Sequence, residues 1–153
     1  MGAESSIEPS GGRVMEQVEV DRLRVAYERA STGPPLVLLH GGVGDGPTLW
    51  RRQLEGLCDD FTVVAWDAPG AGGSSDPPES FGMAGYADCL AGFIKRLGLE
   101  RPHVAGLSFG GPLALELYRL ARRRPEDAGI WPAPRDLAVI LIVVFSLDDT
   151  ATP

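Results

Sequence analysis

Short apolar runs that alternate with amphipathic segments are the feature of this sequence that most limits its fold. Residues 36–39 and 61–66 are apolar runs typical of strands buried on both faces. Residues 103–107 indicate a third short strand, and helical periodicity occupies residues 83–97 and 112–124. Strands that alternate with helices at this spacing predict a mostly parallel sheet with helices on both faces, so the predicted fold class is α/β.

Further segments extend this pattern toward both ends of the chain. Residues 15–20 and 23–29 alternate apolar with polar side chains, which predicts a hairpin that turns at residues 21–22. A short helix is expected over residues 49–57. The apolar run at 137–145 predicts a last buried strand.

Length and composition limit the domain organisation and the partners. The 153 residues suit one domain, expected over residues 15–153 behind a disordered leader at 1–14 that lacks the features of a secretory signal. The 14 basic and 21 acidic side chains give a formal net charge of −7, which argues against nucleic-acid binding. The longest apolar run is far shorter than the about 20 residues that a membrane-spanning helix needs, so no membrane partner is expected.

The two cysteines, Cys58 and Cys89, form neither a disulfide framework nor a spaced metal site. Free thiols indicate a reducing environment, so a cytoplasmic protein is expected. No metal and no cofactor is expected either.

The segment at residues 70–75 loosely resembles a dinucleotide-binding fingerprint. It lacks the third glycine and follows a middle strand, so nucleotide binding is not expected.

A Gly-x-Ser-x-Gly motif, from Gly106 to Gly110 with Ser108 at its centre, lies between a predicted strand and a predicted helix. A serine on such a sharp turn takes a strained backbone conformation and needs small neighbours, which the two glycines supply. The turn exposes the hydroxyl above the sheet and directs the helix N-terminus toward it, where the dipole favours a developing negative charge. The motif therefore predicts a nucleophilic serine.

Glycine-rich loops follow the two preceding buried strands. His40, Gly41 and Gly42 come directly after the first of them, where backbone amides could join that of Phe109 in binding the oxyanion of a tetrahedral intermediate. Residues 67–74 follow the next strand with the pattern Asp-x-Pro-Gly-x-Gly-x-Ser. Together with the serine motif, these loops give three strand–loop units in a fixed order.

This order of motifs resembles the α/β-hydrolase family over residues 15–124. The resemblance implies an incomplete α/β-hydrolase fold in which Ser108 is the nucleophile and the amides of Gly42 and Phe109 form the oxyanion hole. It also implies that His40 orders the oxyanion loop, and that the turn after the second buried strand is scaffolding rather than part of the catalytic machinery.

A serine hydrolase also needs a histidine to take the hydroxyl proton and a carboxylate to orient that histidine. In the family the acid and then the histidine follow the serine, but the only histidines in the chain, His40 and His103, both precede Ser108. His103 begins the strand that ends at the serine, so about 17 Å separates the two along the strand. His40 lies at the correct end of its own strand, where it is expected to shape the loop, and a role as a substitute base is the alternative for it. The segment that carries the histidine in the family is therefore missing, and the chain is expected to be a truncated member of the family.

Two interpretations stay open for the end of the sequence. Residues 143–153 resemble the acid-bearing segment of the family, a buried strand followed by Gly-x-x-Asp-x-x-x-Pro, which would make Asp149 the triad acid. Ser146 stands where the family has glycine. Alternatively, residues 137–145 form the strand directly after the nucleophile helix, which leaves Asp148 and Asp149 as solvated loop residues.

The expected function is hydrolysis of a small carboxylic ester, lactone or related carbonyl compound through an acyl-enzyme on Ser108. Without a base, this chain is expected to be inactive or very weak. The alternative from another class is a non-catalytic fragment or interaction module that shares only the fold. Other chemistries on the same fold, such as C–C bond hydrolysis or epoxide opening, form a third interpretation. The expected partners are a small-molecule substrate and, through an exposed sheet edge, other copies of the chain.

Overall fold

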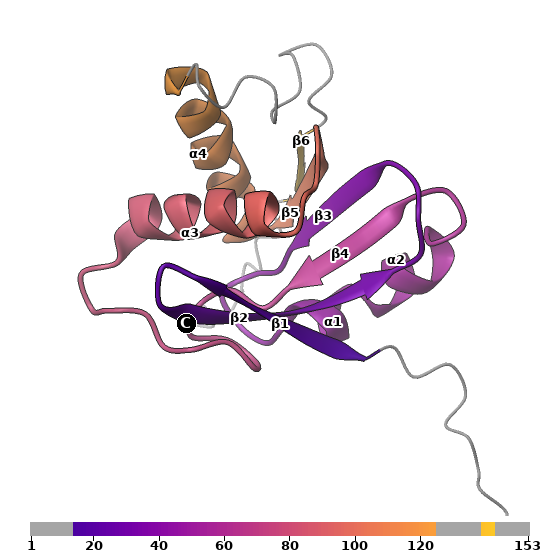
Figure 1. Ribbon diagram of the computed structural model, residues 1–153, viewed down its shortest axis with the longest axis horizontal. Helices are drawn as coiled ribbons and strands as arrows, with labels where there is room; N and C mark the ends of the chain where they lie inside the picture. The colour runs from indigo at the N-terminus through magenta and orange to yellow at the C-terminus, as the bar shows by residue number, and fades with distance from the viewer. Residues whose placement is uncertain (1–13, 125–138, 143–153) are drawn as a thin grey trace, which may run out of the picture.

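The computed structural model describes residues 14–124 and 139–142. These residues form a six-stranded sheet in the order β1-β2-β4-β3-β5-β6, with helices on both faces (Figure 1). The strands are β1 (Met15–Val20), β2 (Leu23–Ala30), β3 (Pro35–Leu39), β4 (Thr62–Trp66), β5 (His103–Leu107) and β6 (Val139–Ile142). The helices are α1 (Gly46–Leu49), α2 (Arg51–Gly56), α3 (Gly82–Arg96) and α4 (Gly110–Arg123). The predicted α/β class is confirmed.

Four neighbouring strands of the sheet run parallel. β3 pairs with β4 on one side and with β5 on the other, and β5 pairs with β6, whereas the pairs β1–β2 and β2–β4 are antiparallel. The register sets Leu38 of β3 opposite both Ala65 of β4 and Ala105 of β5. The carboxyl ends of β3, β4 and β5 therefore meet at one end of the sheet, and the loops that follow these strands lie together there.

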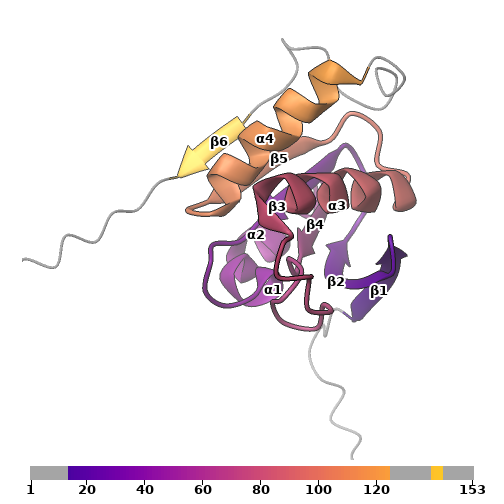
Figure 2. The same ribbon diagram turned by 90° about the vertical axis from the view of Figure 1, so that its left-hand side faces the viewer.

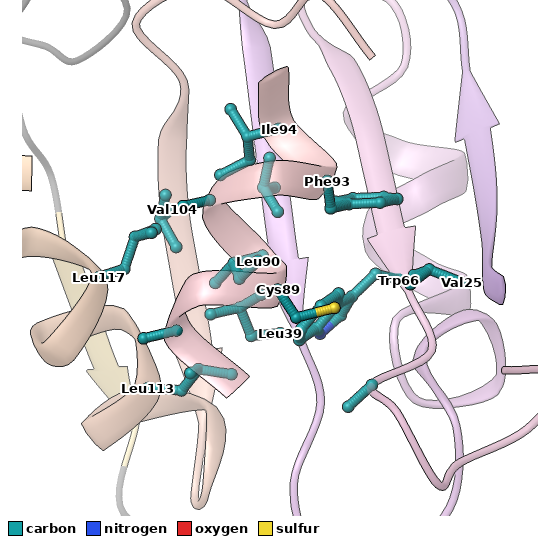
Figure 3. Close-up of a cluster of buried hydrophobic side chains, with 14 of the residues drawn as sticks. Val25, Leu39, Trp66, Cys89, Leu90, Phe93, Ile94, Val104, Leu113 and Leu117 are labelled. Atoms are coloured by element: carbon teal, nitrogen blue, oxygen red, sulfur yellow. The ribbon is translucent and has the colours of Figure 1, made fainter. Parts of the chain in front are cut away.

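Side-chain alternation along the buried strands supplies two separate cores. Leu39 of β3 points to the face that α3 and α4 cover, and it belongs to the same core as Phe93 and Trp66 (Figure 3). Its neighbour Leu38 points to the opposite face and belongs to the core that includes Leu54 of α2. Helices α3 and α4 thus cover one face and α1 and α2 the other (Figure 2). This double coverage explains why the strands are continuously apolar.

The β1–β2 hairpin turns at Asp21 and Arg22, as predicted. Their φ angles of 46° and 69° are the left-handed values of a type I′ turn, which matches the twist of the flanking strands. Strand β2 continues one residue beyond the predicted segment 23–29 and ends at Ala30.

The helix predicted at residues 49–57 is in fact two short helices. Trp50 leaves the helical conformation between α1 and α2, with φ −97° and ψ 17°. α1 begins before the predicted start because the side chain of Asp45 caps it and accepts a hydrogen bond from the Thr48 amide at 2.9 Å. Apolar periodicity revealed neither this cap nor the break at Trp50, and so the prediction started late and joined the two helices.

β6 is the described part of the strand predicted at 137–145. It pairs directly with β5, so no other strand separates it from the strand that precedes Ser108. This position agrees with the interpretation in which the strand directly follows the nucleophile helix. Asp149 and the predicted leader, apart from Val14, lie outside the described residues, and the role of Asp149 stays a prediction.

A partly buried ion pair, with a buried carboxylate and a half-exposed guanidinium, joins the sheet to α2. The side chain of Glu28 in β2 is 2% exposed, and its two carboxylate oxygens accept hydrogen bonds from Arg51 at 2.8 and 2.9 Å. This bidentate geometry satisfies a carboxylate that would otherwise be costly to bury. The hydrogen bonds to Glu28 also raise the pKa of Arg51, which keeps the guanidinium charged.

Replacing Arg51 with methionine is expected to lower the free energy of unfolding by about 2 kcal/mol, because Glu28 loses both of its hydrogen bonds while its carboxylate stays largely buried. Arg52 is an exposed neighbour, and Arg52→Met should change stability by less than about 0.5 kcal/mol. Adding Glu28→Gln to Arg51→Met removes the unpaired charge and should recover part of the loss. Urea unfolding followed by circular dichroism measures all three variants. Equal losses from Arg51→Met and Arg52→Met would contradict a stabilising ion pair.

Candidate active site

Ser108 occupies a sharp turn between β5 and α4. β5 ends at Leu107, α4 begins at Gly110, and Ser108 between them has a φ of 51°. Residues other than glycine rarely adopt this left-handed conformation, so the backbone of the serine is strained. The predicted strand–turn–helix context is confirmed, with the helix beginning two residues before the predicted start at Pro112.

The two glycines of the serine motif are required by close backbone contacts. A Cβ atom on Gly106 would overlap the carbonyl group of Gly110 in the first turn of α4. A Cβ atom on Gly110 would overlap the carbonyl oxygen of Leu39 at the end of β3. Helix α4 therefore approaches both strands more closely than a side chain would allow, and this approach fixes the position of Ser108.

The loop after β3 lies against the serine. A Cβ atom on Gly41 would be 3.4 Å from the Cβ atom of Ser108, which is ordinary van der Waals contact. Gly42 follows Gly41 in the chain, and Phe109 follows Ser108. Among the described residues, neither the Gly42 amide nor the Phe109 amide makes a hydrogen bond. Both predicted oxyanion donors thus belong to segments that meet at the serine, and their role stays a prediction.

His40 is buried and holds the loop after β3 through both ring nitrogens. Nε2 accepts a hydrogen bond from the Ala68 amide at 2.9 Å, so Nδ1 carries the ring proton and donates to the Gly41 carbonyl at 2.6 Å. Because neither nitrogen is free, His40 can accept a proton from Ser108 only after losing its bond to Ala68. The geometry suits the ordering role that the family resemblance implies.

The carboxylate of Asp67 ties the turn after β4 to the same loop. The residue is 2% exposed, and its oxygens accept hydrogen bonds from the Gly46 amide at 3.0 Å and the Gly73 amide at 2.9 Å. Bonds from amides to a buried carboxylate are strong. Gly72 has a φ of 49°, and a Cβ atom there would overlap the Asp67 carboxylate. The glycine-rich turn is therefore built around Asp67 and braces the loop.

No histidine lies where it could serve as the base for Ser108. His103 begins β5, so the length of that strand, about 17 Å, separates it from Ser108. Its ring instead packs edge-on against Phe61, with centroids 6.0 Å apart. Both nitrogens of His40 are already bonded. Within the described residues, the site combines an exposed serine with amide donors but has no histidine in reach.

Tyr86 of α3 is a neighbour of the site to which the sequence analysis gave no role. Its ring contacts that of Phe109 edge-on, with centroids 5.3 Å apart, and its hydroxyl donates to the Pro69 carbonyl at 3.3 Å. Tyr86 therefore connects the serine turn to the turn after β4. Helical periodicity could have indicated that this residue faces inward, but it could not indicate what the residue faces.

Residues 14–124 and 139–142 contain neither a candidate metal site nor a candidate membrane span. No group of three or more His, Cys, Asp or Glu side chains is arranged there to hold a metal ion. No helix in this part of the chain is long and apolar enough to cross a membrane. Cys58 and Cys89 are free thiols.

The sequence of residues 34–126 matches the family model described as alpha/beta hydrolase fold. The chain belongs to this family. The matched segment runs from β3 through α4 and so contains the serine turn and both bracing loops.

Solved structures extend the similarity to three dimensions. A thermophilic esterase from Thermogutta terrifontis is 36% identical, with a TM-score of 0.63, and the match covers 74% of this chain and 42% of the esterase. A membrane phospholipase A described as a bacterial virulence factor is 33% identical, with a TM-score of 0.70, over 87% of this chain and 40% of its own.

Curated relatives give the same family but several activities. The dihydrolipoyllysine-residue acetyltransferase component of the acetoin cleaving system of Cupriavidus necator is 36% identical over 115 residues, which are 75% of this chain and 31% of the relative. The putative carbamate hydrolase RutD of Agrobacterium fabrum is 32% identical over 101 residues, 65% of this chain and 38% of the relative. The chain thus spans about a third of the length of these relatives.

Replacing Ser108 with glycine is expected to stabilise the fold. The left-handed conformation costs a residue with a Cβ atom about 1–2 kcal/mol, and glycine avoids this cost. Glycine also makes the unfolded chain more flexible, which offsets about half of the gain in stability. A net gain of about 0.5–1 kcal/mol is expected. Ser108→Ala retains the Cβ atom and is the matched control, expected to be near neutral. If denaturant unfolding finds the two variants equally stable, the turn is not strained.

Proposed function

We propose that this chain carries the nucleophile and the oxyanion hole of a serine hydrolase for small carboxylic esters, lactones or related carbonyl compounds. The observation that carries the proposal is the exposed Ser108, at φ 51° between β5 and α4 and with the backbone of Gly41 beside its Cβ atom. The names of two similar proteins, a putative carbamate hydrolase and an esterase, support hydrolysis at a carbonyl carbon.

In the proposed reaction, Oγ of Ser108 attacks the carbonyl carbon of the substrate while a base removes the hydroxyl proton. The amides of Gly42 and Phe109 donate hydrogen bonds to the oxyanion that forms, and the N-terminus of α4 adds a favourable dipole. The bond to the leaving alkoxide then breaks, the alkoxide takes up the proton that the base removed from Ser108, and the acyl group stays on Ser108. Attack by water releases the carboxylic acid and restores the serine.

The neutral surroundings of Ser108 support an uncharged substrate. The loop residues Gly42 and Val43 carry no charge, nor do the adjoining rings of Phe109 and Tyr86. Val43 is 94% exposed and offers apolar surface on the loop that adjoins the serine. A charged substrate would gain no counter-ion from these groups, whereas a neutral ester could bury its apolar part against them.

A role in self-association is the second candidate, and the two sheet edges support it. β1 exposes Glu16 and Glu19 along one edge, and charges there discourage pairing with another strand. β6 at the other edge has the uncharged sequence of Val139–Ile142 and pairs with β5 alone among the described strands. We therefore propose that copies of the chain associate at β6.

We also propose a cytoplasmic location, which the two free thiols support.

The mass of the chain in solution tests the association. Light scattering coupled to size-exclusion chromatography is expected to give a mass that rises with concentration, because pairing at an uncharged edge is a bimolecular equilibrium. A single mass equal to the 16.3 kDa of one chain at every concentration would rule the association out.

Ester hydrolysis by the purified chain is expected to be far slower than in a complete serine hydrolase. Loss of the base lowers turnover by about 10⁶ in a comparable triad, or about 8 kcal/mol of barrier. Oxyanion stabilisation and binding retain a factor of about 10³–10⁴ over water. We expect p-nitrophenyl acetate to turn over at less than about 1 s⁻¹, and this residual rate to disappear in Ser108→Ala.

Added imidazole gives a sharper test because it supplies a base from solution. The hydrolysis rate should rise with imidazole concentration more steeply in the wild type than in Ser108→Ala, whose slope measures direct attack of imidazole on the ester. Ser80→Ala, at an exposed serine before α3, is the matched control and should behave as the wild type. Equal slopes in the wild type and Ser108→Ala would contradict a nucleophilic Ser108. Turnover above about 1 s⁻¹ without imidazole would instead reveal a base within the chain or its assembly.

A further inference from the structure

A cavity lies apart from the serine turn, where the β1–β2 hairpin meets the start of α3. β1 and α3 lie side by side there (Figure 1). The cavity has a volume of about 340 Å³, which is within the range of small-molecule pockets, about 300–1,000 Å³. Three segments separated in sequence line it, namely the hairpin turn at residues 20–23, Pro78 and Phe81 before α3, and Gly85, Asp88 and Cys89 within α3.

The inner part of the cavity is apolar. Val20 and Cys89, on facing elements, are 2% and 4% exposed, and the side chains of Leu23 and Phe81 are partly buried beside them. Burial raises the pKa of Cys89 to about 12, so near neutral pH the thiol is protonated and behaves as a small apolar group. A ligand would therefore bury hydrocarbon rather than charge against this wall.

The rim of the cavity is charged but balanced. Asp21, Arg22 and Asp88 are exposed at the opening, and Asp88 is paired with Arg124 at 2.8 Å. The lining itself holds two carboxylates and one guanidinium, and Arg124, which lies outside the lining, balances the charge of Asp88. A charged ligand would be attracted by one kind of group at the rim and repelled by the other. A neutral hydroxyl or carbonyl group could instead hydrogen-bond to a carboxylate or to a guanidinium group.

Phe81 forms a fixed wall between this cavity and the serine turn. A Cβ atom on Gly85 would lie 2.7 Å from Cδ2 of Phe81, so glycine at this position allows the ring to rest against α3. The ring also contacts Tyr86 edge-on, with centroids 5.0 Å apart, and Tyr86 in turn contacts Phe109. The ring of Phe81 is therefore held beside the cavity, and the three contacting rings of Phe81, Tyr86 and Phe109 extend from the cavity to the serine turn.

We propose that this cavity is a binding site for a neutral, largely apolar small molecule that carries one hydrogen-bonding group, and that it is distinct from the serine site. The carrying observation is the combination of an apolar wall with a rim whose charges are balanced. The proposal does not depend on the hydrolase function, because neither Ser108 nor its neighbouring loop contributes to the lining.

The test uses benzyl alcohol as the neutral probe and benzylammonium and benzoate as charged probes of the same shape. Amide resonances of the ¹⁵N-labelled chain are followed during titration. Benzyl alcohol is expected to cause saturable shifts at Leu23, Gly85 and Cys89 but not at Gly42, and to bind at least about tenfold more tightly than either ion. No saturable shift, shifts centred on the loop after β3, or equal affinity for the ions would each overturn the proposal.

Two variants that alter the cavity, Leu23→Trp and Gly85→Ala, and one control variant outside it complete the test. Leu23→Trp places a larger side chain in it, and Leu115→Trp adds the same side chain on the exposed face of α4 as the matched control. Binding should be lost in the first and unchanged in the second. Gly85→Ala, which forces the Phe81 ring to shift, should weaken binding about tenfold or more and serves if Leu23→Trp does not fold. Unchanged binding in a folded Leu23→Trp or Gly85→Ala chain would refute the assigned position.

Discussion

The close contact of α4 with the ends of β3 and β5 is the constraint on which the rest of the structure depends. Gly110 lies where any side chain would overlap the Leu39 carbonyl, and Gly106 stands in the same relation to Gly110. Backbones approach this closely only where Cβ atoms are absent. The chain must then turn from strand to helix within two residues, and the left-handed conformation of Ser108 is the consequence. Parallel pairing of β3 with β5 and the burial of α4 hold the strained residue in place.

Buried polar contacts extend this order from the serine turn to the neighbouring loops. His40 and Asp67 are nearly inaccessible to solvent, and each of their ring nitrogens and carboxylate oxygens has a backbone partner. In a buried setting such bonds are strong when complete and costly when one partner is lost. The loops after β3 and β4 therefore hold one arrangement relative to each other. Gly41 is kept against Ser108 by this network, so the geometry at the serine exists before any substrate binds.

The strands and the turn at Ser108 could be predicted because residues close together in the sequence determine them. Continuous apolar runs marked the strands, because a strand buried on both faces needs an apolar side chain at each successive position. Glycine spacing marked the turn at Ser108, because the contact between Gly106 and Gly110 joins residues close in sequence. Boundaries set by distant contacts were missed. The start of α4 at Gly110 depends on its contact with Leu39, which no helix propensity reveals. Tyr86 adjoins the site only because α3 packs against α4.

The groups that position Ser108 are not groups that could remove its hydroxyl proton. Backbone contacts and buried polar groups between β3 and α4 position Ser108, and all of them lie within the described residues. Proton transfer instead requires a side chain with a free nitrogen or oxygen near the hydroxyl. His40 cannot meet both needs, because freeing Nε2 would leave the buried Ala68 amide without an acceptor. The bonds that make His40 effective in ordering the loop exclude it as a base, and His103 lies at the far end of β5. Efficient catalysis at Ser108 therefore requires a base other than these two histidines.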